Sequence, residues 1–520
     1  MSSFKFLGYI CLFLPAVMLA YHLAPQKFRW AVLLAASYIF FIIDSGVLLA
    51  YLLISTLVVY LCALWIEKYK GQEKESLRAA ASKEEKKLIK SAFARKKNLI
   101  AALALAINFG IIAVLKYSPF FGSIFGIQTR YYLLPLGISF YTMMAASYII
   151  DVKRGTISAD RHIGRVALFL GFFPQIMEGP MCRYSDTAEQ LFTGNPLEYK
   201  NICRGFQRIA IGMAKRMLVA DRVNNYVGWM YEFYDGFDGG MLALASLCYL
   251  FQLYMDFSGT MDIVLGSAEI FGIKLPENFK RPFFSRTISE FWTRWHITLG
   301  TWFRDYIFYP VSMSKPMKKL SNSSRKKLGN YYGPLTSGTV ALMLVWLCNG
   351  LWHGSGWQFL FFGFYYFALI LIGNLIQPPS RFVLNKLHIN SESTAYRIFQ
   401  AIRTLLLVNL GEIFFRAPDL QTAFAFIGKM AGSFTFASLF NGTVFKYWLD
   451  PCDICLLMAV LILLVIIGIK EEKGHDIRDD ISSLKPCWRW AIYAALVMAC
   501  IIMGGYGTGY SYVEPIYAKF

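Results

Sequence analysis

The stretch "VWLCNGLWHGSGWQFLFF", residues 345–362, decides the fold because it is almost wholly apolar and carries a single ionisable side chain, His353. It lies in a longer segment, between Lys327 and Arg381, that contains no Asp, Glu, Lys or Arg. A helix needs roughly 20 mostly apolar residues to cross the hydrocarbon core of a bilayer. The segment therefore predicts helices that cross a membrane.

The rest of the chain repeats this pattern. Of its 520 residues, 56% are hydrophobic and 16% are charged, whereas a soluble domain carries about 25% charged residues. Further charge-free runs lie at 98–115, 131–150, 239–255, 455–468 and 491–510. Counting such runs gives roughly ten to twelve spans. We predict an all-α polytopic membrane protein.

The net charge of +19 arises from 52 Lys and Arg against 33 Asp and Glu. On a soluble chain this excess would suggest a nucleic-acid partner. In a membrane protein, basic residues concentrate in cytoplasmic loops and face the anionic inner leaflet. The partner that the charge predicts is therefore the bilayer and not a nucleic acid.

The distribution of basic residues predicts the orientation. The run 67–97 has eleven Lys or Arg against five Glu and follows three apolar segments, which places the N-terminus outside if the run is cytoplasmic. The run 315–327 has six basic residues and no acid, and the loop 470–489 has five basic residues. Lys519 is the only basic residue that follows the last span. The C-terminus is therefore expected outside as well.

The chain is expected to form one membrane domain over residues 1–520. Within it we distinguish a cytoplasmic basic loop (about 67–97), short re-entrant or interfacial helices (about 155–235), a motif core (about 250–366), and a last span with an extracellular tail (about 487–520). No internal repeat is evident, which disfavours the inverted-repeat architecture of many transporters.

Ionisable groups inside the membrane are the first candidates for a functional site, since each costs on the order of 2.5 to 3.5 kcal/mol to insert. They form three clusters in this sequence. The clusters are Tyr254, Asp256, Ser258 and Asp262; Glu290, Arg294, His296, Arg304 and Asp305; and Asn349 with His353.

The second cluster has helical spacing. Trp292, His296, Gly300 and Arg304 are four residues apart, so a continuous helix would place them on one stripe. Such a stripe suggests the wall of a polar channel. The alternative is an interfacial helix in which Arg304 and Asp305 form a structural ion pair.

His353 is the strongest candidate for chemistry. Glycines at 350, 354 and 356 would let another group approach the backbone closely. Imidazole can take a proton from an alcohol and pass it to a leaving group, and a wall that excludes water would protect a thioester from hydrolysis. The alternative is a hydrogen-bonded core histidine. No carboxylate partners are evident for a two-histidine metal site, so no metal is expected.

Five blocks of the sequence together resemble the membrane-bound O-acyltransferases, in particular the bacterial group that O-acetylates alginate or D-alanylates teichoic acid. The blocks are "PLGISFYTMMAASYIIDVKRG" (135–155), "FFPQIMEGPMCRYSD" (172–186), "QLYMDFSGTMDIVLG" (252–266), "PENFKRPFFSRTISEFWTRWHITLGTWFRDYIFYP" (276–310) and "NGLWHGSGWQFLFFGFYY" (349–366).

The resemblance implies that His353 is the catalytic histidine and His296 the second histidine of the family. It also implies a ring of about 11–12 transmembrane helices around short re-entrant ones that form a central funnel, in the inner membrane of a bacterial cell. Residues expected to line the channel or orient the substrate are Asn349, Trp352, Trp292, Trp295, Arg304, Asp305, Tyr254 and Asp256.

The chain ends in "YVEPIYAKF" (512–520), and similar proteins end in an aromatic tail. The resemblance suggests that Tyr517 relays the acyl group to an extracellular or periplasmic acceptor, either an esterase-like protein or a polysaccharide. Ala518 and Lys519 depart from the aromatic pattern, and a disordered terminus is the alternative.

These observations predict an O-acyltransferase that moves an acetyl group from cytoplasmic acetyl-CoA, or from a carrier-protein thioester, toward a cell-surface polysaccharide, without a bound cofactor. D-Alanyl transfer to teichoic acid is an alternative within the same class. A transporter or flippase of lipid-linked sugars is an alternative of another class. The enzyme hypothesis requires that His353 faces a water-filled path between the two sides of the bilayer.

Overall fold

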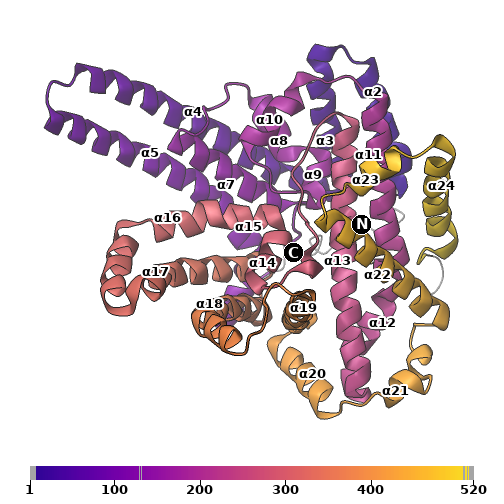
Figure 1. The fold of residues 1–520 in the computed structure, drawn as a ribbon. Coiled ribbons are helices and arrows are strands. Elements are labelled where there is room, and N and C mark those ends of the chain that lie inside the picture. The colour runs from indigo at the N-terminus through magenta and orange to yellow at the C-terminus, as the bar shows by residue number, and fades with distance from the viewer. Residues whose placement is uncertain (1–6, 128, 131, 507–509, 512, 514–520) are drawn as a thin grey trace.

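The computed structural model describes residues 7–127, 129–130, 132–506, 510–511 and 513, and helices account for most of them (Figure 1). Among these residues the only β pairing is an isolated bridge between Phe279 and Trp295. The predicted all-α class is confirmed.

Eight helical stretches in the described part of the chain are long and apolar enough to cross a membrane. They are Gln26–Ala79, Lys83–Ile124, Gly239–Ile270, Lys315–His353, Trp357–Lys386, Thr394–Arg416, Pro451–Glu472 and Pro486–Met503. The prediction of a polytopic membrane protein is confirmed.

The number of stretches is smaller than the expected number of spans for a structural reason. The first stretch contains two helices, α3 (Arg29–Ser45) and α4 (Leu49–Ala79). In addition, the apolar segment Tyr9–Leu23 and the 17-residue α7 (Ile138–Arg154) are too short to be counted as full crossings. Composition alone predicts a span for each apolar segment, including short ones such as these, so it gives a larger number.

The long helix α13 (Gly239–Ile270) lies deep in the protein, with 67% of its most apolar segment buried. α11 (Tyr199–Lys215) packs directly against it through glycines. A Cβ added to Gly212 would lie 2.4 Å from the carbonyl oxygen of Gly259, and one on Gly266 would lie 2.6 Å from that of Gly205. Small residues at such positions allow two membrane helices to approach closely.

Ion pairs follow the same contact between α11 and α13. Arg204 Nε lies 3.1 Å from Glu269 Oε1, and Arg208 Nε lies 3.0 Å from Asp262 Oδ1. Lys215 Nζ lies 2.7 Å from the other oxygen of Asp262. Partner numbers fall along α13 as they rise along α11, so the two helices run antiparallel.

α4 and α5 (Lys83–Ile112) form a long hairpin that projects from the body of the protein at the left of Figure 1. Lys97 of α5 and Glu73 of α4 join the two helices through an ion pair of 2.5 Å. The basic run 67–97 therefore forms the outer part of this hairpin.

Three basic segments meet on one side of the molecule. The Nζ atom of Lys70, in the hairpin, lies 3.9 Å from the position of a Cβ on Gly155, just after α7. Arg154 Nη2 donates a hydrogen bond of 3.1 Å to the carbonyl oxygen of Asp305, in the π-helical turn η8 (Arg304–Phe308) that leads into the basic run 315–327.

The last part of the motif core, around His353, lies in a tight helical hairpin. α17 (Lys315–His353) bends at Gly329, where φ is 77°, and is followed by α18 (Trp357–Lys386). A Cβ on Gly350 would lie 2.4 Å from the carbonyl oxygen of Phe359, and one on Gly363 would lie 2.3 Å from that of Trp346. Larger side chains would force the two helices apart.

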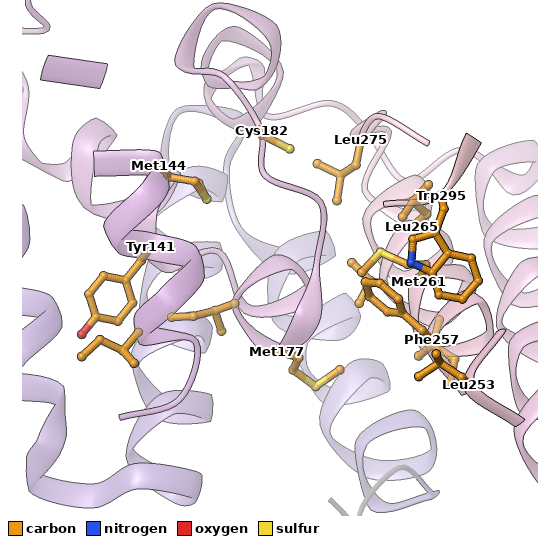
Figure 2. Packing of buried hydrophobic residues seen from close by; sticks show 14 of the residues in the cluster. Tyr141, Met144, Met177, Cys182, Leu253, Phe257, Met261, Leu265, Leu275 and Trp295 are labelled. Carbon is orange, nitrogen blue, oxygen red and sulfur yellow. The ribbon is translucent and has the colours of Figure 1, made fainter. Parts of the chain in front are cut away.

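Shorter helices complete the fold around this core. Figure 2 shows Met177 of α9 between Tyr141 of α7 and Phe257 of α13 in the buried interior. The helices not yet named are α2 (Leu14–Leu23), α6 (Ser118–Ile124), α8 (Ile163–Gly171), α9 (Phe173–Glu178), α10 (Tyr184–Thr193), α12 (Asp221–Glu232), α14 (Ile288–Arg294), α15 (Ile297–Phe303), α16 (Tyr309–Ser312), α19 (Thr394–Arg416), α20 (Leu420–Gly432), α21 (Ala437–Phe440), α22 (Pro451–Glu472), α23 (Ile477–Ser482) and α24 (Pro486–Met503).

Candidate active site

His353 is the last residue of α17, and aromatic rings surround it. Its ring centroid lies 4.9 Å from that of Trp352, 5.5 Å from that of Phe362 and 5.2 Å from that of Phe415, each in an edge-on arrangement. The side chain is only 3% exposed. The expectation that His353 faces a water-filled path is therefore not met in this structure, where the described rings enclose it.

The glycines beside His353 serve packing in this structure. A Cβ on Gly354 would lie 2.2 Å from a ring carbon of Phe359, and one on Gly356 would lie 2.3 Å from the side-chain oxygen of Gln358. The close approach that the sequence predicted does occur, but the groups that approach are neighbouring residues at the start of α18.

His296 lies at a break between two short helices, so the predicted helical stripe is wrong. α14 ends at Arg294, and His296 has left-handed backbone angles, φ 46° and ψ 51°, before α15 begins. The bridge between Phe279 and Trp295 holds the break, and the N–H of Ile297 donates a hydrogen bond of 3.0 Å to the carbonyl oxygen of Asn278.

Asn278 anchors this break through its side chain. Its Oδ1 accepts hydrogen bonds from the backbone N–H of Thr298 at 3.0 Å and from the Thr298 hydroxyl at 2.9 Å, and it lies 3.3 Å from Nδ1 of His296. The first of these bonds satisfies a free N–H in the first turn of α15, as an N-cap residue would. Asn278 thus fixes both the start of α15 and the imidazole before it.

The structure brings the two predicted histidines to the same aromatic ring. The indole of Trp352 lies 5.5 Å from the ring centroid of His296 and 4.9 Å from that of His353. Phe257 packs edge-on against His296 at 4.9 Å. Burial lowers the pKa of His296 to about 3, so this imidazole is neutral at physiological pH.

Two further predicted residues carry buried polar atoms with no hydrogen-bond partner among the described residues. These atoms are Oδ1 of Asn349 and Nε1 of Trp292. Asn349 precedes His353 by one helical turn on α17. Trp292 contacts Trp346, also on α17, with ring centroids 4.9 Å apart. A buried acceptor and a buried donor are therefore available near the histidines.

Tyr254, Asp256 and Trp295 lie on the side of α13. The ring centroid of Tyr254 is 6.0 Å from that of Trp295. Asp256 forms a fully buried ion pair with Arg216, which also donates a hydrogen bond of 2.7 Å to the hydroxyl of Thr260. The ion pair of Asp256 joins α13 to η5 (Arg216–Ala220), the turn after α11, whereas Tyr254 contacts the residue directly before His296.

Arg304 and Asp305 lie near the surface, with side chains 53% and 36% exposed. Arg304 Nε pairs with Asp305 Oδ1 at 3.0 Å, and Arg183 Nη2 lies 3.3 Å from the other carboxylate oxygen. This arrangement is the structural ion pair that the sequence analysis held as the alternative.

Tyr517 lies outside the described residues. Shortly before it, Val513 is held by Asp221, whose carboxylate accepts its N–H at 2.8 Å, and by Arg216, which donates to its carbonyl oxygen at 3.0 Å. Metal ligation has no candidate set, since no group of three His, Cys, Asp or Glu forms a possible site in the described part of the chain.

Sequence reasoning missed Lys116 and Tyr117, which follow α5. Lys116 Nζ donates a hydrogen bond of 2.6 Å to the carbonyl oxygen of Trp352, and the hydroxyl of Tyr117 donates one of 2.5 Å to that of Leu351. The signal was present, because Lys116 is a cation at the end of the apolar run 98–115. By sequence alone, Lys116 marks only the end of that run.

Comparisons with known proteins add an independent line of evidence. A family model described as "MBOAT, membrane-bound O-acyltransferase family" matches residues 35–324. A probable alginate O-acetylase, AlgI, of Azotobacter vinelandii is 28% identical over 89% of this chain and 84% of its own. A peptidoglycan O-acetyltransferase of Helicobacter pylori is 30% identical over 64% of each chain. A teichoic acid D-alanyltransferase of Bacillus subtilis is 29% identical over 46% of this chain and 59% of its own.

Proposed function

The chain belongs to the membrane-bound O-acyltransferase family, and from this premise we propose that it uses His353 to transfer an acetyl group from a cytoplasmic thioester to hydroxyl groups of a cell-surface polysaccharide. The observation that carries the proposal is the pair of buried imidazoles, His353 and His296, which both contact the ring of Trp352. Relatives named as alginate and peptidoglycan O-acetylases support the acetyl group and the polysaccharide acceptor.

The proposed chemistry needs one base that acts twice. His353 takes the proton of the attacking hydroxyl while the hydroxyl oxygen bonds to the carbonyl carbon of the thioester. The carbon–sulfur bond then breaks, and His353 returns the proton to the leaving thiolate. The products are an ester and a free thiol, with no change in oxidation state.

The aromatic rings around His353 give this chemistry a water-poor setting. Trp352, Phe362 and Phe415 enclose the imidazole, and exclusion of water protects a thioester from hydrolysis. The same rings block the substrates in the conformation described above. We therefore infer that at least one of them moves when a substrate binds.

Asn349 and Trp292 are suited to orient the substrates. The buried Oδ1 of Asn349 can accept a hydrogen bond from an acceptor hydroxyl, and the buried Nε1 of Trp292 can donate one to a carbonyl oxygen. Buried polar atoms without partners are costly, so a ligand that satisfies them gains affinity. His296 is neutral and held by Asn278, which suits a positioning group.

The donor is proposed to be acetyl-CoA approaching from the cytoplasm. The basic hairpin 67–97, the end of α7 and the turn before 315–327 meet on one side of the molecule, and basic segments favour the cytoplasmic side. In this orientation both termini lie outside the cell. The CoA phosphates would meet a positively charged surface.

The acyl group is proposed to leave on the outer side of the inner membrane of a bacterial cell. It passes either directly to a polysaccharide or through Tyr517 to an esterase-like protein partner. D-Alanyl transfer from a carrier-protein thioester is the second candidate, and the Bacillus subtilis relative named as a teichoic acid D-alanyltransferase favours it.

The proposal is tested in cells by His353→Ala, with His475→Ala as the matched control, because His475 is an exposed loop histidine. Ester-linked acetate on surface polysaccharide is released by mild base and measured, together with the amount of each variant in the membrane. We expect His353→Ala to remove the acetate and His475→Ala to retain it. Normal acetylation in the His353 variant would overturn the proposal, and loss of ester-linked D-alanine instead would favour the second candidate.

A further inference from the structure

Lys116 is a buried lysine whose amino group binds the backbone beside the candidate catalytic histidine. It lies in the π-helical turn η4 (Ala113–Tyr117) that follows α5, and it is 6% exposed. Its Nζ donates a hydrogen bond of 2.6 Å to the carbonyl oxygen of Trp352, the residue before His353. Single π-helical turns occur frequently at functional sites.

The adjacent Tyr117 makes a parallel contact. Its hydroxyl donates a hydrogen bond of 2.5 Å to the carbonyl oxygen of Leu351. Two successive residues of η4 thus bind two successive carbonyl groups of α17, although the two segments are far apart in the sequence. We call Lys116 and Tyr117 the η4 clamp.

The η4 clamp binds the part of α17 that needs external donors. The last four carbonyl groups of a helix have no N–H partner within the helix, and the helix carries partial negative charge at this end. α17 ends at His353, where the N–H of Gly354 donates to the carbonyl oxygen of Gly350. Lys116 supplies this terminus with a hydrogen-bond donor from outside the helix.

The position of the clamp bears directly on the imidazole. The carbonyl group that Lys116 binds belongs to Trp352, whose indole contacts the rings of both His353 and His296. If the last turn of α17 unwinds, the Trp352 and His353 side chains move with it. A buried ammonium is expensive at membrane depth, so packing alone would favour an apolar side chain of similar length.

We propose that Lys116, assisted by Tyr117, is a positioning residue that holds the last turn of α17 and thereby fixes His353 in its reactive geometry. The inference rests on the proposed function, since it assigns the clamp a role in acyl transfer through His353. It adds two residues of η4 to a site otherwise built from α13 to α19.

The test compares four variants of the purified full-length protein in detergent. Lys116→Met keeps the length of the side chain and removes the charge, Lys116→Arg restores a cationic donor, and Tyr117→Phe removes only the hydroxyl. Ser118→Ala is the matched control, because the Ser118 hydroxyl donates at 2.6 Å to the carbonyl oxygen of Val114, four residues earlier in the same helical stretch, and not to α17. The kcat and KM for labelled acetyl-CoA are measured for each variant.

We expect Lys116→Met to lower kcat about 30-fold or more, since a displacement of about 1 Å in an active site reduces rates by about 100-fold. The KM should stay within about twofold, because the clamp holds the base and not the donor. Lys116→Arg should recover part of the loss, and Tyr117→Phe should lower kcat by a smaller factor. Ser118→Ala should match the original protein.

A second measurement does not depend on activity. Hydrogen exchange of the backbone amides in residues 349–354 is followed by mass spectrometry. We expect faster exchange in Lys116→Met and unchanged exchange in Ser118→Ala, because only the former loosens the end of α17. A purely structural role for Lys116 would lower the thermal stability of the whole protein and leave kcat per folded molecule unchanged.

The proposal is overturned if folded Lys116→Met retains at least half of the original kcat, or if exchange in residues 349–354 does not change. Should Lys116→Met fail to fold, Tyr117→Phe decides, and an unchanged kcat there overturns the proposal. Should the original protein transfer no acetyl group, the proposed function fails, and the exchange measurement alone decides whether the clamp holds α17.

Discussion

Replacing Asn278 by Ala perturbs the construction of the site while both imidazoles are kept. The amide oxygen of Asn278 accepts hydrogen bonds from the backbone N–H and the hydroxyl of Thr298, at 3.0 and 2.9 Å, and lies 3.3 Å from Nδ1 of His296. Asn278 and Thr298 are both buried. The substitution therefore leaves donors in the interior without their acceptor.

The magnitude follows from two losses. Removing an N-cap-like acceptor costs about 0.5–2 kcal/mol, and leaving a buried donor unsatisfied costs about 1–3 kcal/mol. Because both losses share the bond to the N–H of Thr298, we expect about 2–4 kcal/mol in total. His296 has a φ of 46°, a left-handed conformation that costs roughly 1–2 kcal/mol. Without its anchor, His296 is expected to relax and move away from Trp352.

The assay combines thermal unfolding in detergent with acyl transfer from labelled acetyl-CoA. Asn409→Ala is the matched control, since Asn409 is a buried asparagine that donates to the Ser246 hydroxyl at 2.9 Å. Ser246 lies about three turns of α13 before Phe257, the residue of α13 that contacts His296. We expect both variants to melt at lower temperature and only Asn278→Ala to lose most of its acyl transfer. Full transfer activity in Asn278→Ala would refute the reasoning that this side chain positions His296.

Two further predictions concern the ion pair and the aromatic rings. Arg216→Met leaves the carboxylate of Asp256 buried and unpaired, so we expect a loss of about 3–5 kcal/mol in stability. The double variant Arg216→Met with Asp256→Leu should recover much of this loss. Equal melting temperatures for the single and double variants would contradict the prediction. Trp352→Ala removes the ring that contacts both imidazoles, so we expect less acyl transfer and faster hydrolysis of the thioester, measured as free labelled acetate in the absence of an acceptor. Unchanged hydrolysis in that variant would show that the ring does not exclude water.

Fold class followed from the sequence because it depends on composition along the chain. Charge-free runs such as 455–468, which lies within α22, favour a helix in a bilayer because a helix satisfies its own backbone. The number of spans was less accessible, since α7 is apolar but only 17 residues long. Whether such a segment crosses the membrane or packs inside the protein depends on the helices around it. The hydropathy of the segment gives no information about those helices.

The candidate site could be predicted only in part, for a related reason. His296 and His353 stood out as ionisable groups in apolar surroundings, and both lie against Trp352. The four-residue spacing after Trp292 fitted a continuous helix, yet the chain breaks at His296. Asn278 holds that break from a segment before α14, and periodicity within one helix carries no information about such a partner.

Tertiary partners also changed the interpretation of single residues. Asp256 was expected in a channel because a lone carboxylate in an apolar helix suggests one, but Arg216 pairs with it. Lys116 bonds to Trp352 across 236 positions of sequence. Interactions of this range depend on how the helices pack, so a single sequence indicates the candidates but not their partners.

The central claim is that His353 transfers the acyl group, and acyl transfer by the purified protein tests it most directly. The full-length protein and its His353→Ala variant are incorporated into vesicles, given labelled acetyl-CoA on one side and a soluble polysaccharide on the other, and the label on the polysaccharide is measured. The account predicts a labelled ester with the original protein and with His475→Ala, and none with His353→Ala. A labelled ester formed at the original rate by His353→Ala would contradict it.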